Sequence, residues 1–133
     1  MKTTVVAIPS IHPGGLDSPI GAHFGHCDLY TLVEVVDGQV QKVRTLPNVP
    51  HQQGGCMAPV NHLAQHGVQI LIAGGMGMRP LMGFNQVGIA VLYGADAQTV
   101  GDAVKAFLNG TLPQFTSEFT CGGGGGGQPM GRM

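Results

Sequence analysis

The feature that most constrains the fold is a repeated alternation of strand-like and helix-like segments in the second half of the chain. Two continuous apolar runs, Val68 to Ala73 and Gly88 to Tyr93, have the length and composition of buried strands. Helix-like segments surround them: residues 58–67, a segment that begins at residues 79–82, and residues 100–108. This order predicts β-α-β units with right-handed crossovers and a parallel arrangement of these strands. The last helix-like segment follows Thr99, which begins a pattern that resembles a capping box, and it ends at Gly110. Its apolar side chains fall on one helical face: Val100, Ala103, Val104, Phe107 and Leu108.

The first half of the chain predicts an antiparallel part of the same sheet. Residues 3–8 form an apolar run that we expect Pro9 to end. Leu29 to Val36 and Gln39 to Leu46 are typical strands, and Asp37-Gly38 between them is a hairpin turn signal. A hairpin beside β-α-β units predicts an α/β fold with a five-stranded mixed sheet and helices on its faces.

Composition and charge narrow the classes of function. The chain has 133 residues, of which 43% are hydrophobic and 10% charged, so it is long and apolar enough for one packed domain. Six basic and seven acidic side chains nearly cancel and no basic block is present, which argues against nucleic-acid binding. No apolar run reaches the length of a membrane span, and the first ten residues do not resemble a signal peptide. We therefore expect a cytoplasmic protein without membrane contact.

The C-terminal segment differs from the rest of the chain. Six consecutive glycines, Gly122 to Gly127, follow Cys121. Because glycine adds no apolar surface, we expect residues 1–112 to form the domain and residues 113–133 to form a flexible Gly-rich tail. The three cysteines form no CxxC unit, and free thiols suit a reducing compartment.

Side chains that bind metals concentrate in two predicted loops. The first loop contains His23, His26 and Cys27, and the second contains His51 and Cys56. Neutral imidazole and thiolate are good ligands for Zn, Cu or Fe. For any one of these residues alone, a hydrogen bond to a neighbouring loop or packing in the core explains its presence equally well. Their concentration makes metal chemistry the first hypothesis.

A thiol enzyme is an alternative hypothesis. Gly54-Gly55-Cys56 precedes the helix predicted from Ala58, and a helix N-terminus favours a thiolate. His51 or His23 would then serve as the base. No wider catalytic signature accompanies this thiol, so we expect the protein not to be an enzyme.

A glycine loop between a strand and a helix predicts an anion site. Gly74-Gly75-Met76-Gly77 presents backbone N–H groups and the positive helix end, and Arg79 adds charge. The loop lacks both the GxGxxG and the P-loop patterns of nucleotide sites. Met76, Met78 and Met82 suit either core packing or a soft lining for a polarisable ligand. A regulatory module for a phosphorylated ligand bound at residues 74–80 therefore remains open beside an anionic metal–sulfur cluster, which the nearby His and Cys residues favour.

These segments resemble the dinitrogenase iron–molybdenum cofactor biosynthesis family over nearly all of residues 3–112. Each motif is short, but their order and spacing together are specific. The matching motifs are His23-Phe24-Gly25, Gly54-Gly55-Cys56, Ile72–Pro80, Tyr93-Gly94-Ala95 and Val104–Gly110.

The resemblance implies a ribonuclease-H-like fold and the binding or transfer of a metal–sulfur cluster, of the Mo–Cu–S or Mo/Fe–S type. It also implies a donor or acceptor protein as partner. The ribonuclease-H-like fold does not imply nuclease activity here. A nuclease needs several converging carboxylates, and only Glu34 is predicted to lie in a strand. The resemblance also implies that the family's HFG histidine takes part in cluster binding, and this role carries over to His23. The expected metal ligands are His23, His26, Cys27, His51 and Cys56, and the expected cluster contacts are His23, Phe24, Gly25, Gly54, Gly55, Gly74, Gly75, Met76, Gly77, Met78 and Arg79.

Overall fold

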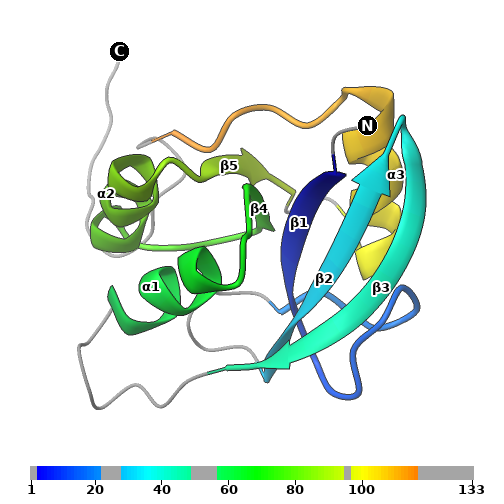
Figure 1. Cartoon of the computed structure of the whole chain (residues 1–133), viewed down its shortest axis with the longest axis horizontal. Coiled ribbons are helices and arrows are strands. Elements are labelled where there is room, and N and C mark those ends of the chain that lie inside the picture. The colour runs from blue at the N-terminus through cyan, green and yellow to red at the C-terminus, as the bar shows by residue number, and fades with distance from the viewer. Residues whose placement is uncertain (1–2, 22–27, 49–56, 95–96, 117–133) are drawn as a thin grey trace.

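A computed structural model describes residues 3–21, 28–48, 57–94 and 97–116. Its five strands form one mixed sheet in the order β3-β2-β1-β4-β5 (Figure 1). Strand β1 is antiparallel to β2 and parallel to β4, β2 is antiparallel to β3, and β4 is parallel to β5. The mixed α/β sheet predicted from the sequence is therefore confirmed. The elements are β1 (Thr3–Ser10), β2 (Leu29–Val36), β3 (Gln39–Pro47), α1 (Met57–Gln65), β4 (Ile70–Ala73), α2 (Met78–Val87), β5 (Ala90–Tyr93) and α3 (Val100–Asn109).

The hairpin of β2 and β3 forms at the predicted turn. Asp37 and Gly38 have φ angles of 54° and 78°, so both central residues are left-handed. Two left-handed residues are the requirement of a type I′ turn, whose twist matches that of the flanking strands. The turn chemistry of Asp-Gly therefore specifies the register of this hairpin.

The expectation that Pro9 ends the first strand is wrong. Strand β1 continues to Ser10, and Pro9 pairs with Tyr30 of β2. The carbonyl oxygen of Pro9 accepts a hydrogen bond from the N–H of Gly21 at 2.8 Å, so the backbone polar groups of Pro9 point away from β2. On that side β4 pairs only with Val6 and Ala7, so the missing N–H of proline costs no ladder hydrogen bond.

Each helix ends at a glycine in the left-handed conformation. Gly67, Gly88 and Gly110 have φ angles of 78°, 82° and 73°. The residue after each glycine then donates its N–H back into the helix: Val68 to Leu63, and Ile89 to Phe84. This Schellman pattern explains why β4 and β5 begin later than the apolar runs, since the first residues of both runs close the preceding helix.

The core lies on both faces of the sheet. Helices α1 and α2 cover one face and α3 covers the other (Figure 1). Leu63 of α1 and Phe84 of α2 are fully buried on the first face, and Val100 of α3 is fully buried on the second. Leu108, which was predicted on the buried stripe of α3, is 38% exposed, so this expectation is wrong.

A buried aromatic side chain lies just after the predicted domain boundary at residue 112. Phe115 is 3% exposed and belongs to the core cluster of α1 and α2. Its N–H donates to Val91 of β5 at 2.8 Å, and its ring meets that of Tyr93 edge to face at 5.7 Å. The segment that contains Phe115 therefore packs along β5 as part of the domain.

Candidate functional site

The N-terminus of α2 is the best candidate for an anion-binding group. The chain leaves β4 at Ala73, crosses the loop of residues 74–77 and enters α2 at Met78. Gly77 is the N-cap residue, with φ −80° and ψ 175°, and it supplies no side-chain cap. Because Pro80 has no N–H, the free donors of the first turn are those of Met78 and Arg79.

No hydrogen bond within the described part of the chain occupies the N–H groups of residues 74–79. These amides and the positive end of a ten-residue helix are the donor set that an anion needs. The exposed Arg79 lies in the same turn. The glycine loop predicted from the sequence therefore does open a helix, as expected.

The structure separates the roles of three methionines near this loop. Met76 is 1% exposed and packs in the core cluster of α1 and α2. Met78 and Met82 are 43% and 53% exposed. Met76 is thus core packing, whereas the thioethers of Met78 and Met82 are accessible to a polarisable ligand near the start of α2.

The N-terminus of α3, by contrast, is already occupied. The Thr99 hydroxyl accepts a hydrogen bond from the N–H of Asp102 at 3.2 Å, as the predicted cap requires. The N–H of Gly101 donates to Leu16 at 2.7 Å, and the N–H of Val100 donates to Ser18 at 2.9 Å. The loop after β1 therefore uses the donors of α3, whereas those of Met78 and Arg79 in α2 have no such partner among the described residues.

The loop after β1, which contacts α3, precedes the predicted cluster ligands in the sequence. The buried Thr31 hydroxyl fixes the start of this loop: it lies 2.8 Å from the Ser10 hydroxyl and accepts a hydrogen bond from the N–H of Gly15 at 3.1 Å. Sequence reasoning missed both hydroxyl residues. The only signal was a polar residue inside each of two apolar strands, which required a buried partner.

Topology brings four loops to one edge of the sheet. Strands β1, β3, β4 and β5 run in the same direction, and Ser10, Leu29 and Pro47 lie in register at the carboxyl end of β1 and β3. The loops after these four strands therefore begin at the same edge, where α/β proteins bind ligands. The N–H of Gly94 donates to Ala73 at 3.0 Å and joins two of the loops.

All five predicted metal ligands lie outside the described residues. The bordering residues Gly21, Asp28, Asn48 and Met57 belong to the described part of the chain. Elsewhere in that part, no group of three or more His, Cys, Asp or Glu side chains has a metal-binding arrangement. The predicted metal ligands and cluster contacts outside the described ranges are His23, Phe24, Gly25, His26, Cys27, His51, Gly54, Gly55 and Cys56.

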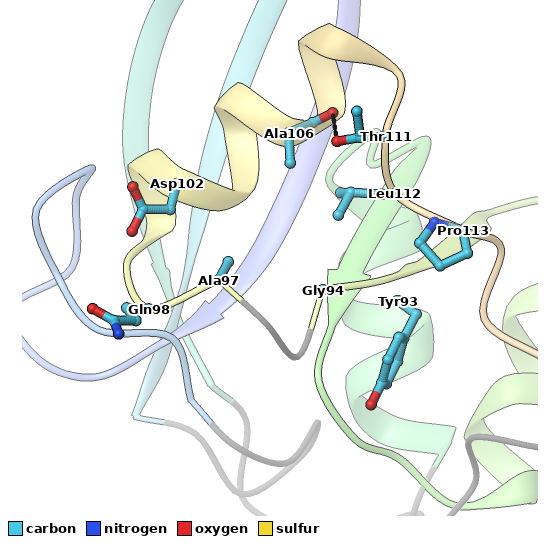
Figure 2. Close-up of a pocket in the computed structure, with 9 residues that line it drawn as sticks. All are labelled: Tyr93, Gly94, Ala97, Gln98, Asp102, Ala106, Thr111, Leu112 and Pro113. Atoms are coloured by element: carbon cyan, nitrogen blue, oxygen red, sulfur yellow. Dashed lines mark hydrogen bonds between the residues drawn. The ribbon is translucent and has the colours of Figure 1, made fainter.

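A cavity of ≈ 530 Å³ lies on the α3 side of β5 (Figure 2). Tyr93, Gly94, Thr111 and Pro113 are among the residues that line it. Among the described residues that line it, the charged one is Asp102, and none is His or Cys. Because a carboxylate repels an anion, this cavity does not suit an anionic cluster.

No helix in the described ranges is long and apolar enough to cross a membrane.

Comparison with known proteins gives consistent relatives. The sequence profile described as dinitrogenase iron-molybdenum cofactor matches residues 4–110. An uncharacterized protein of Methanocaldococcus jannaschii, MJ0580, is 28% identical over 98 residues, which cover 72% of this chain and 82% of that protein.

Solved structures share the fold. The crystal structure of PH0822 has a TM-score of 0.71 at 28% identity and covers 84% of this chain and 96% of its own. The apo form of the orange protein from Desulfovibrio gigas has a TM-score of 0.74 at 23% identity, with 84% and 92% of the two chains covered, and is similar in fold. Because the family profile spans most of the chain, this protein belongs to the dinitrogenase iron-molybdenum cofactor family.

Proposed function

We propose that this protein binds and carries an anionic metal–sulfur cluster, for cofactor biosynthesis or metal storage, without catalysing a reaction. The observation that carries the proposal is the set of N–H groups at the start of α2, on the carboxyl edge of the sheet, that have no hydrogen-bond partner among the described residues. Sulfide-rich clusters are anions, and backbone amides at a helix N-terminus stabilise negative charge. Family membership supports the same cargo.

The cluster would lie between the loop of residues 74–77 and the loops that follow β1 and β3. In this arrangement Met78 and Arg79 supply amides, and Arg79 also supplies a positive charge. The metal ligands proposed from the sequence are His23, His26, Cys27, His51 and Cys56, and the cluster is of the Mo–Cu–S or Mo/Fe–S type.

The remaining parts of the proposal concern the setting of the carrier. The strand order and the mixed strand directions support the ribonuclease-H-like assignment of the fold. Free thiols favour a reducing compartment, so we place the protein in the cytoplasm. A carrier also needs a donor or acceptor protein, which would approach the same carboxyl edge of the sheet.

The test reverses the charge at the start of α2. We expect Arg79→Glu to weaken the binding of tetrathiomolybdate, measured by equilibrium titration without oxygen, by about tenfold, which corresponds to about 1.4 kcal/mol. Lys105→Glu makes the same change in net charge on the exposed surface of α3 and is the matched control. We expect it to leave the affinity within about twofold, because exposed charges at a distance are screened.

The same titration separates the phosphorylated-ligand alternative from the cluster. A free helix N-terminus also suits phosphate. Binding of a nucleotide or sugar phosphate that is lost in Arg79→Glu, with no binding of tetrathiomolybdate or iron sulfide to the native chain, would favour the alternative. Equal affinities of Arg79→Glu and Lys105→Glu for tetrathiomolybdate would show that α2 does not bind the cluster.

A further inference from the structure

His62 on α1 and His66 in the turn directly after it form a close pair that the cluster proposal does not use. His62 and His66 are one helical turn apart, and their ring centroids are separated by 4.8 Å at an interplanar angle of 70°. Residues four apart on a helix face the same side. The turn that contains His66 continues α1 through the hydrogen bond from its N–H to Leu63, so both rings lie along the same side. The half-buried His62 contacts Pro47 at the end of β3, and His66 is exposed.

Hydrogen bonds determine which nitrogen of each ring is free. Nε2 of His62 lies 3.0 Å from the carbonyl oxygen of Pro47, and Nδ1 of His66 lies 2.8 Å from the carbonyl oxygen of His62. A carbonyl oxygen only accepts, so these two nitrogens carry the protons in the neutral rings. The lone pairs are therefore on Nδ1 of His62 and Nε2 of His66. Histidines that bind metals commonly donate their other N–H to a carbonyl in this way.

The separation of the rings suits one metal ion. A metal bonded to an imidazole at about 2.0–2.1 Å lies about 3.2 Å from the ring centroid. With both lone pairs directed at the same ion, two centroids 4.8 Å apart correspond to a nitrogen–metal–nitrogen angle of about 100°, between the square-planar and the tetrahedral values. Imidazole is a preferred ligand of Zn²⁺, Ni²⁺ and Cu²⁺. We propose that His62 and His66 chelate a single divalent transition-metal ion, with water completing its coordination, at a site distinct from that of the cluster.

The test uses Ni²⁺ as the probe and the full chain with the five proposed metal ligands replaced by Ala, so that His23, His26, Cys27, His51 and Cys56 do not compete for the ion. Substoichiometric Ni²⁺, which is paramagnetic when water completes its coordination, broadens the NMR signals of the His62 and His66 rings and of the backbone near them first. In His66→Ala this broadening is lost and the Ni²⁺ affinity falls at least about tenfold, because a two-ligand site becomes a one-ligand site. His12→Ala removes another exposed histidine and is the matched control, with the affinity unchanged.

A second variant separates metal binding from helix capping. His62→Gln keeps an N–H donor for the Pro47 carbonyl but removes the ring, and its Ni²⁺ affinity falls as in His66→Ala. In the otherwise native chain, both variants retain tetrathiomolybdate binding. Arg79→Glu retains Ni²⁺ binding, so loss of binding at one site leaves the other intact. Unchanged Ni²⁺ affinity in His66→Ala and His62→Gln, or first broadening at other residues, would overturn the proposal. A loss of stability alone would assign the pair to capping the end of α1.

Discussion

Phe115→Ala is expected to lower the free energy of unfolding by about 3–5 kcal/mol, because it removes a buried aromatic ring and leaves a cavity. Phe115 is 3% exposed, packs in the core cluster of α1 and α2 and contacts the ring of Tyr93. The measurement is urea denaturation followed by circular dichroism. Met82→Ala, at a side chain that is 53% exposed, is the control, and we expect it to change stability by no more than about 0.5 kcal/mol.

This prediction tests where the folded domain ends. If residues beyond 112 formed only a tail, Phe115→Ala would behave like Met82→Ala. A cost below about 1 kcal/mol, within the range of ordinary surface substitutions, would contradict the packing of this segment along β5.

The second prediction concerns the loop that docks on α3. A Cβ added at Gly101 would lie 3.1 Å from the carbonyl oxygen of Leu16, the acceptor of the Gly101 N–H. In Gly101→Val the additional methyl groups push this carbonyl away, and we expect a loss of about 1–3 kcal/mol of stability through overpacking. Gly101→Ala, which adds only the Cβ, is expected to lie between Gly101→Val and the native protein.

The same substitution is expected to weaken cluster binding. The loop that Gly101 holds leads to His23, and displacement of a positioned ligand by about 1 Å is enough to disturb a binding site. The measurement is tetrathiomolybdate titration under conditions where Gly101→Val remains folded by circular dichroism. Asn109→Val places the same side chain at the exposed far end of α3 and is the control. A folded Gly101→Val that binds tetrathiomolybdate with native affinity would show that the loop does not position the cluster site.

Local sequence signals predicted most of the fold. The Asp-Gly hairpin, the Thr99 cap and the helix ends at Gly67 and Gly110 depend on a few neighbouring residues, whose backbone preferences favour one structure. Two other features depend on distant parts of the chain. Pro9 can continue β1 because the neighbouring strand β4 pairs only with Val6 and Ala7. Phe115 can pack because β5 is the last strand of the sheet, so the following segment can pair with its outer side. Neither partner is evident from the residues around Pro9 or Phe115.

The sequence predicted only those parts of the candidate site that neighbouring residues form. The loop of residues 74–77 and the start of α2 lie next to each other in sequence, and the glycine pattern indicates their role. The docking of Leu16 and Ser18 on α3 joins residues more than eighty positions apart, so no local pattern predicts it. The four-residue spacing of His62 and His66 is a local signal that places them on one side of a helix. The contact of His62 with Pro47 depends on how α1 packs against the end of β3, so no local pattern predicts it.

The most direct test of the proposed function is the absorption spectrum and metal content of the native protein. The protein is purified without oxygen, and a portion is then incubated with tetrathiomolybdate or with iron and sulfide. We expect a coloured protein with bound metal and sulfide in fixed proportion, and at least about tenfold weaker uptake by His23→Ala. A protein that is colourless and free of metal as purified, and that takes up neither tetrathiomolybdate nor iron sulfide, would contradict the proposal.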